Sequence, residues 1–137
     1  LLQGKCWNSL PAPRNGEGKE LTLTGATAML AVGPDGEAQI ICAGGVNHDI
    51  FWDAISGTYS KVAQADYLKK DISWYQFNGC PLTYKLKTER WEILSHQTSL
   101  LARAGAQVAM RKHTLYYIGG ELKPGLRSPG IVQLDLR

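Results

Sequence analysis

Two polar stretches of this chain hold the side chains best suited to chemistry. Each follows a glycine pair at the end of an apolar run, and together they present an amide, an imidazole, a carboxylate, an ammonium and a guanidinium group. The residues are Asn47 and His48 in the first stretch, and Glu121, Lys123 and Arg127 in the second. Groups of these types form polar sites for small polyhydroxylated or anionic ligands. We expect such a site if the fold brings the two stretches together.

Glu121 and Arg127 differ in what they can do. A carboxylate can take up and return a proton, so Glu121 is the candidate acid/base. A guanidinium keeps its proton, so Arg127 suits the binding of a substrate carboxylate through paired hydrogen bonds. Taken alone, each is more often an ordinary polar residue at a strand end or in a loop, so the surrounding pattern has to decide.

The elements around the two stretches form two similar units. In each unit a tryptophan run, a Gly-Ala run, an apolar run ending in Gly-Gly and a further strand-like run follow in the same order. The last three runs are 25–30, 40–45 and 82–86 in the first unit, and 105–110, 115–120 and 131–136 in the second. Short runs of β-branched, aromatic and aliphatic residues bounded by Gly, Pro, Asn and Asp predict strands.

This pattern resembles the kelch repeat, in which roughly 50 residues form one four-stranded blade of a β-propeller. Glycine suits the pairs because strands crowd near the propeller axis and leave no room for a Cβ. Strand-end loops of successive blades converge on one face, so the two polar stretches should be neighbours in space. The resemblance predicts an all-β fold with a short helical insertion.

Reading the strands in order divides residues 1–137 into one complete blade and parts of two neighbours. Residues 22–94 form the complete blade with an insertion at 47–79, and 95–137 form the first three strands of the next blade. Residues 1–21 are the end of a preceding blade, with a strand near 5–10, and a linker. Propellers close with ~4–8 blades, so we expect a segment of a longer propeller. Self-assembly of short chains into a ring is the alternative.

The insertion distinguishes the first unit from the second. Residues 58–72 place apolar side chains at a three-to-four-residue spacing, which predicts a short amphipathic helix. Trp52, Trp74, Tyr75 and Phe77 flank this segment. They either cap the helix against the blade or form a wall or lid for a ligand at the propeller mouth, because a loop this long is usually functional or self-packed.

Composition excludes several classes of protein. Hydrophobic residues make up 44% of the chain and charged residues 20%, which favours a buried core over disorder. Fifteen Lys and Arg against 12 Asp and Glu give a net charge of +3 with no basic block, too mild to predict binding to nucleic acid or an anionic membrane. No apolar run approaches the ~18–20 residues that a membrane span needs.

The three cysteines predict neither a metal site nor a disulfide framework. Cys6, Cys42 and Cys80 form no Cys-x-x-Cys pair and have no histidine at metal-ligand spacing. Cys42 lies in an apolar run, where a buried free thiol is expected. Whether Cys6 and Cys80 pair is left open.

Three motifs make the resemblance closer than kelch in general. They are Gly-Gly-Val-Asn-x-x-Ile-Phe (44–51), Trp-Tyr-Gln-Phe-Asn ahead of a Leu-x-Tyr strand (74–84), and Gly-Glu-x-Lys-Pro-Gly-Leu-Arg (120–127). Over residues 20–137 the chain resembles the N-acetylneuraminate epimerase (sialic acid mutarotase) family, especially its cyclically permuted mutarotase branch. The third motif is the most specific. The resemblance implies a six-bladed kelch propeller of the bacterial periplasm that interconverts the α and β anomers of N-acetylneuraminate.

The same resemblance implies roles for individual residues. Glu121 is the catalytic acid/base, and Arg127 is its catalytic partner in acting on the substrate. The candidate substrate-binding residues are Asn47, His48, Arg103 and Lys123. A structural role is the alternative for Arg103, and an exposed loop is the alternative for His48. Neither a cofactor nor a metal is implied, and the insertion departs from the better-known branch, which leaves the preferred sugar open.

Anomerisation of a ketose sugar needs a base for the anomeric hydroxyl proton and an acid for the ring oxygen. We expect the 137-residue segment to be inactive by itself, because the other blades would complete the ring. A non-enzymatic propeller scaffold that binds a protein or a glycan is the alternative function. Large apolar anchors on the loops would favour the scaffold, and a narrow polar pocket lined by Glu121, Arg127 and Asn47 would favour the enzyme. A copper-oxidase propeller would need a Tyr/His ligand set that these residues do not present.

Overall fold

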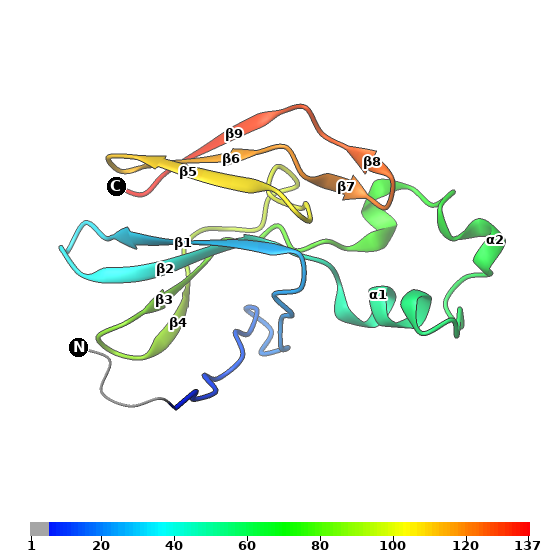
Figure 1. Ribbon diagram of the computed structural model, residues 1–137, viewed down its shortest axis with the longest axis horizontal. Helices are drawn as coiled ribbons and strands as arrows, with labels where there is room; N and C mark the ends of the chain where they lie inside the picture. The colour runs from blue at the N-terminus through cyan, green and yellow to red at the C-terminus, as the bar shows by residue number, and fades with distance from the viewer. Residues whose placement is uncertain (1–5) are drawn as a thin grey trace.

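The computed structural model describes residues 6–137 and contains two larger antiparallel sheets and a two-stranded antiparallel hairpin. The two sheets lie one above the other, and the helices and a short hairpin lie together at the end away from the C-terminus (Figure 1). The predicted all-β architecture is therefore confirmed.

The first sheet has four strands in the order β1-β2-β3-β4, each antiparallel to the next. Its strands are β1 (Ala26–Val32), β2 (Ala38–Gly44), β3 (Leu82–Lys85) and β4 (Arg90–Ile93). Gly36 adopts a left-handed backbone in the turn between β1 and β2, and Glu89 does the same before β4. Trp91 of β4 stands opposite Tyr84 of β3, and their rings pack at 5.1 Å. This cross-strand aromatic pair stabilises the outer edge of the sheet.

The second sheet has three strands in the order β5-β6-β9, and a two-stranded hairpin interrupts its sequence. The sheet strands are β5 (Gln107–Arg111), β6 (Thr114–Ile118) and β9 (Ile131–Asp135). The hairpin strands are β7 (Glu121–Lys123) and β8 (Leu126–Arg127). The polar stretch after the second glycine pair therefore forms this hairpin instead of an irregular loop.

The expected strand near 5–10 is wrong over the described residues 6–10. These residues have no regular secondary structure, and Trp7 is fully exposed. The first backbone pairing along the described chain joins Arg14 and Glu20. A strand needs a neighbour for its backbone hydrogen bonds, and none of the described strands pairs with residues 6–10. The remainder of that prediction falls on residue 5, which lies outside the described residues.

The predicted helix over 58–72 is also largely wrong. The insertion contains α1 (His48–Ile55), the single turn α2 (Gln64–Tyr67) and a 3₁₀ turn, η1 (Ile72–Tyr75). The longest helix thus begins directly after the first glycine pair. Asn47 caps it, because its side-chain oxygen accepts a hydrogen bond from the backbone N–H of Ile50 at 3.1 Å.

A side-chain hydrogen-bond network explains why no helix begins at residue 58. The Asp53 carboxylate accepts hydrogen bonds from the backbone N–H groups of Ser60 and Lys61 and from the Ser60 hydroxyl. Tyr59 lies between them in a left-handed conformation with φ 47°. The hydrogen bonds hold Tyr59 in this conformation, which a right-handed helix beginning at residue 58 could not include.

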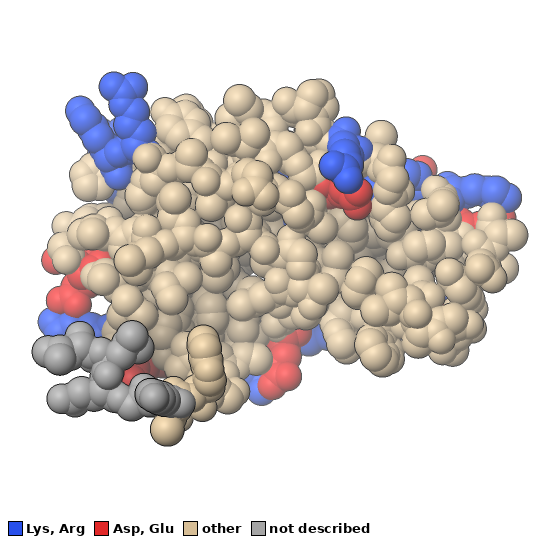
Figure 2. Space-filling view, viewed as in Figure 1, with Lys and Arg blue, Asp and Glu red and all other residues tan. Residues whose placement is uncertain are grey.

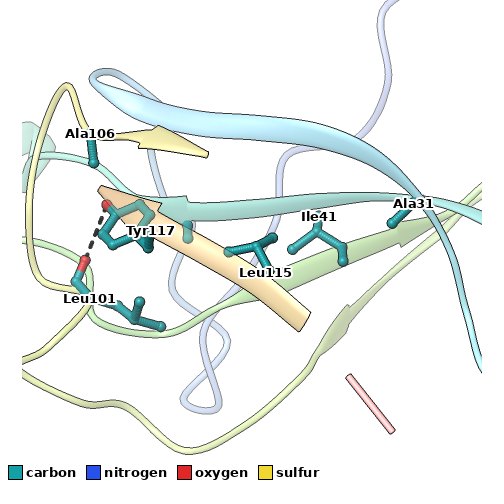
Figure 3. Close-up of a cluster of buried hydrophobic side chains, with 7 residues drawn as sticks. Ala31, Ile41, Leu101, Ala106, Leu115 and Tyr117 are labelled. Carbon is teal, nitrogen blue, oxygen red and sulfur yellow. Dashed lines mark hydrogen bonds between the residues drawn. The ribbon is translucent and has the colours of Figure 1, made fainter. Parts of the chain in front are cut away.

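The larger of the two hydrophobic cores joins the two sheets (Figure 3). Its buried side chains come from β1, β2, β6 and the segment before β5: Ala31, Ile41, Ala43, Leu101, Ala106, Leu115 and Tyr117. The Tyr117 hydroxyl donates to the carbonyl of Leu101 at 3.4 Å, which satisfies a polar group within the apolar core. Burial raises the pKa of Tyr117 to about 12, so this hydroxyl remains a donor at neutral pH.

The expected close approach at the glycine pairs is confirmed at Gly44 and Gly120. A Cβ on Gly44 would overlap the Tyr117 hydroxyl and the carbonyl oxygen of Arg103. A Cβ on Gly120 would stand 3.0 Å from the Cβ of Ala106. Both glycines also have positive φ angles, 76° and 87°. Only glycine meets both demands without strain.

Within residues 6–137, no helix combines the length and apolar character required to cross a membrane.

Candidate active site

Residues 103–105 bring the two polar stretches together. The N–H of Gly45 donates to the carbonyl of Arg103 at 2.8 Å, and the N–H of Gly105 donates to the carbonyl of Gly25 at 2.7 Å. Ala104 and Glu121 exchange two backbone hydrogen bonds of 2.8 and 3.0 Å. The ends of the two sheets are thereby joined, and the prediction that the stretches are neighbours is confirmed.

A cavity of about 400 Å³ lies at this junction. Its polar side includes Asn47, Glu121 and Arg127. Its apolar side includes four aromatic residues, Phe51, Tyr67, Tyr75 and Phe77. A volume of this size suits one small ligand. The three polar residues that the motifs singled out therefore share one cavity.

Glu121 and Arg127 are cross-strand partners in the hairpin. Arg127 Nε lies 3.7 Å from Glu121 Oε1, and the side chains are 84% and 37% exposed respectively. An ion pair this exposed contributes little to stability. The Arg127 guanidinium can therefore leave the carboxylate and turn to an anionic ligand at small cost.

Asn47 has both a structural contact and a free polar group. Its side-chain oxygen is engaged in capping α1. Its amide NH₂ group donates no hydrogen bond to any described residue. Because Asn47 lines the cavity, this group is available to donate to a ligand oxygen.

His48 and Lys123 line a wide, open groove beside the cavity and do not line the cavity itself, whereas Glu121 and Arg127 line the cavity alone and Asn47 lines both. His48 is exposed in the first turn of α1 and stacks on Trp52, with ring centroids 6.3 Å apart. Lys123 Nζ donates to the carbonyls of Leu68 at 3.1 Å and Lys70 at 2.7 Å. Neither the His48 nor the Lys123 side chain makes a hydrogen bond to Asn47, Glu121 or Arg127.

Arg103 lies under the second sheet and lines neither space. Its side chain is buried, and Nη1 donates to the carbonyls of Gly119 at 2.9 Å and Gly130 at 3.3 Å. Its guanidinium carbon also stands 5.9 Å from the centroid of the Tyr117 ring. These contacts hold the chain on both sides of the hairpin, which matches the structural alternative for Arg103.

The aromatic wall of the cavity is the part that sequence reasoning identified least completely. Tyr75 and Phe77 were expected to flank the insertion, as a cap or as a wall, but Phe51 and Tyr67 were not singled out. Tyr67 and Tyr75 pack edge to face at 5.5 Å, and the Tyr75 hydroxyl donates to the carbonyl of Tyr67. Desolvation raises the pKa of both phenols, so the wall is uncharged. The available signal was the clustering of aromatic residues on both sides of the insertion.

The charged side chains outside the cavity form no continuous patch on the face shown in Figure 2, where they stand in small separated groups. Ion pairs outside the cavity include Arg14 with Glu20 and Lys87 with Glu37.

The His, Cys, Asp and Glu side chains of residues 6–137 form no group of three or more that could hold a metal ion. All three cysteines are free, so Cys6 and Cys80 do not pair in this structure. Cys42 is buried as expected, and burial raises the pKa of its thiol and that of Cys80.

No protein-family model matches the chain. Among curated proteins it is similar to the N-acetylneuraminate epimerase of Escherichia coli O9:H4 (strain HS), with 32% identity over 101 residues, covering 67% of this chain and 27% of that protein. The N-acetylneuraminate epimerase of Escherichia coli (strain K12) is 30% identical over 100 residues, with the same two coverages. The chain spans about a quarter of the length of the curated relatives it matches.

Among solved structures the chain is similar to YjhT, with a TM-score of 0.64 and 27% identity, covering 87% of this chain and 34% of that one. YjhT is a kelch β-propeller, so the predicted kelch-type fold is confirmed. The resemblance to N-acetylneuraminate epimerases inferred from the three motifs is confirmed as well.

Proposed function

We propose that the protein is a sialic acid mutarotase, an isomerase that interconverts the α and β anomers of N-acetylneuraminate. One observation supports this above all others: Asn47, Glu121 and Arg127 meet in one cavity of about 400 Å³ with an aromatic wall. The similarity to proteins named N-acetylneuraminate epimerase supports the choice of substrate.

Substrate binding begins with the carboxylate of the sugar acid. Arg127 is the more exposed partner of the Glu121 ion pair, so it can exchange that partner for the substrate carboxylate. A guanidinium binds a carboxylate in a bidentate arrangement, which fixes the orientation of the sugar ring. The same exchange frees the Glu121 carboxylate to act on the neighbouring anomeric hydroxyl.

Glu121 then removes the proton of the anomeric hydroxyl. The O–H electron pair forms the carbonyl at the anomeric carbon, the bond from this carbon to the ring oxygen breaks, and the ring oxygen takes up a proton from water or another donor. Rotation of the open chain presents the opposite face of the carbonyl. Reclosure reverses the proton transfers and yields the other anomer, so substrate and product have the same composition.

The aromatic wall supplies the rest of the environment. Tyr67, Tyr75 and Phe77 offer apolar surface to the C–H groups of the sugar and to the methyl group of its acetamide. Asn47 offers amide N–H donors to a sugar oxygen. Polar and apolar groups lining the same cavity hold the ring in a defined orientation, which the proton transfers at Glu121 require.

The test is a comparison of full-length wild-type protein with Glu121→Gln. A sialidase releases one anomer of N-acetylneuraminate from a glycoside, and proton NMR follows its conversion above the uncatalysed rate. We expect Glu121→Gln to lower the rate constant by ~10²–10⁴-fold, the usual contribution of a positioned acid/base. Glu92→Gln is the matched control, because Glu92 is an exposed carboxylate of β4 outside the cavity. An unchanged rate in Glu121→Gln would remove Glu121 from the mechanism.

A propeller scaffold that binds a protein or a glycan without catalysis is the second candidate. The exposed apolar side chains of the insertion favour it, since Trp52, Ile55 and Leu68 are each more than half exposed. The NMR experiment separates the two functions. A scaffold would leave the anomer ratio to relax at the uncatalysed rate, even where the sugar binds.

A further inference from the structure

The hairpin β7–β8 carries both Glu121 and Arg127, although it is one of the smallest elements of the fold. Its strands have three and two residues. A two-stranded hairpin is marginally stable by itself, so its geometry depends on contacts with other elements. The contacts that hold this hairpin therefore decide where the two charged groups stand.

The base of the hairpin is held by backbone hydrogen bonds. Glu121 exchanges two of them with Ala104, and the N–H of Ser128 donates to the carbonyl of Gly120 at 2.8 Å. These bonds fix the first and last residues of the hairpin. They leave the tip to be held by other contacts.

The tip is held by Lys123, the last residue of β7. Its Nζ donates to the carbonyls of Leu68 and Lys70, which lie between α2 and η1 more than 50 residues earlier in the chain. The same Nζ stands 6.0 Å from the centroid of the Tyr75 ring. Hydrogen bonds from a charged donor are about twice as strong as neutral ones, and the ring adds a favourable cation–π contact.

The segment that Lys123 holds is the one that builds the aromatic wall. Leu68 follows Tyr67 directly, and the Tyr75 hydroxyl donates to the carbonyl of Tyr67. Tyr67 and Tyr75 both line the cavity that Glu121 and Arg127 also line. One ammonium group thus connects the polar side of the cavity to its apolar side.

These contacts leave Lys123 poorly placed for binding the substrate itself. Two of its three N–H donors are already engaged with main-chain carbonyls, and the residue lines the open groove instead of the cavity. This differs from the direct substrate-binding role that the family resemblance implied for it.

We propose that Lys123 is a positioning residue. It clamps the β7–β8 hairpin to the insertion, and so fixes the distance between the Glu121 carboxylate and the aromatic wall. The assignment rests on the proposed function for its effect on catalysis, while the clamp itself is a property of the fold.

Lys123→Met tests the clamp, because methionine keeps the length of the apolar stem and removes the three donors. In full-length protein without ligand, we expect amide hydrogen exchange in residues 64–76 to accelerate about 10-fold or more, the effect of losing hydrogen bonds to a charged group. Exchange in β1–β4 should stay unchanged. In the NMR assay, kcat should fall by ~10–100-fold, as expected when reacting groups are displaced by about 1 Å.

Two further variants make the test specific. Lys69→Met removes an exposed lysine of the same segment, whose Nζ pairs with Asp66 instead of the hairpin, and should change neither measurement. Lys123→Arg keeps a charged donor that can reach two carbonyls, and should restore slow exchange and much of kcat.

The outcomes are distinct. Unchanged exchange in Lys123→Met together with a raised KM would show direct substrate binding and overturn the clamp. Faster exchange with an unchanged kcat would confirm the clamp as structural and overturn its role in positioning Glu121. A wild-type protein without mutarotase activity would overturn the proposed function, while the exchange data would still decide the clamp.

Discussion

The two polar stretches occupy matching places in the two sheets, yet one folds into a helix and the other into a hairpin. After Gly45, Asn47 caps α1, and the chain travels about 30 residues through the insertion before the N–H of Asn78 donates back to the carbonyl of Gly45 at 2.9 Å. After Gly120, the chain turns back at once through β7 and β8. The first stretch leads into the aromatic wall, and the second carries the reactive groups.

The difference shows how a repeated fold can build an asymmetric site. The glycine pairs place both stretches at the same junction, because each pair follows a strand whose buried side chains pack in the core shared by the two sheets. The residues after each pair then decide the local structure. An asparagine at the cap position begins a helix, whereas Pro124 and Gly125 form the turn of a hairpin, with Gly125 at φ 79°.

The largest expected effect on stability concerns the first glycine of each pair. Gly44 and Gly119 occupy matching positions, but a Cβ on Gly44 would meet more closely placed atoms than a Cβ on Gly119. Gly44→Ala should lower the free energy of unfolding by about 3 kcal/mol or more, because the methyl group overlaps Tyr117 and Arg103 in addition to the cost of a positive φ. Gly119→Ala should cost only about 1–2 kcal/mol, since the nearest atom to its Cβ is the Ser128 carbonyl oxygen at 3.6 Å. Urea denaturation followed by circular dichroism measures both.

Gly36→Ala is the control for the glycine comparison. Gly36 also has a positive φ, but no atom lies within 4 Å of its Cβ position. It should therefore behave like Gly119→Ala. Equal destabilisation by all three substitutions would show that backbone strain alone matters, and that close approach of the two sheets at Gly44 does not.

The strands of the two sheets and the polar junction could be predicted from the sequence because they depend on short-range patterns and on the repeat, whereas the β7–β8 hairpin was not predicted and the strand expected near 5–10 is absent from residues 6–10. Apolar runs ending in glycine predicted β2 and β6, and the ring geometry implied by the repeat brought Asn47 near Glu121. These features arise from alternation, turn residues and the need to bury both sheets against one another.

The insertion could not be predicted in the same way. The apolar spacing over 58–72 favoured a helix, but the turn in which Asp53 bonds Ser60 and Lys61 holds Tyr59 in a left-handed conformation that a helix starting there could not include. The wall residues Phe51 and Tyr67 meet in the cavity through contacts between distant segments. Such contacts have no signature in local periodicity. For the same reason the sequence left the role of Arg103 open and predicted that Lys123 binds substrate, since both bond main-chain carbonyls far along the chain.

A smaller effect is expected at Asn47, the capping residue in the stretch that folds into α1. Two substitutions separate the capping of α1 by its side-chain oxygen from the proposed hydrogen bond of its amide group to the sugar. Asn47→Ala should cost about 1 kcal/mol of stability by removing the cap of α1. Asn47→Asp keeps a capping oxygen and removes the amide donors, so its stability should be close to wild type. If the amide donates to the sugar, Asn47→Asp should still raise the KM for N-acetylneuraminate in the NMR assay. A normal KM would show that Asn47 serves only the helix.

The smallest expected effect concerns the Asp53 carboxylate at the end of α1. It holds the start of the insertion loop by hydrogen bonds, as Lys123 of the hairpin holds residues 68 and 70. Hydrogen bonds from the Ser60 hydroxyl and from the backbone of Ser60 and Lys61 lower the pKa of Asp53 below its ordinary value of 3.8. The ionised form therefore stabilises the turn at neutral pH, and this contribution is lost as the pH falls through the lowered value. Hydrogen exchange of the Ser60 and Lys61 amides should accelerate as the pH falls through the lowered pKa of Asp53, once the exchange rates are corrected for the intrinsic effect of pH on hydrogen exchange.

Asp53→Asn should show fast exchange at these two amides at every pH, because the neutral side chain accepts hydrogen bonds more weakly. Asp66→Asn is the matched control, since Asp66 pairs with Lys69 on the same insertion and does not contact the turn. The exchange of residues 64–76 should remain slow in Asp53→Asn if Lys123 holds that part independently. Accelerated exchange across the whole insertion would show instead that the two anchors act as one unit, and that the helix side and the hairpin side of the cavity are mechanically coupled.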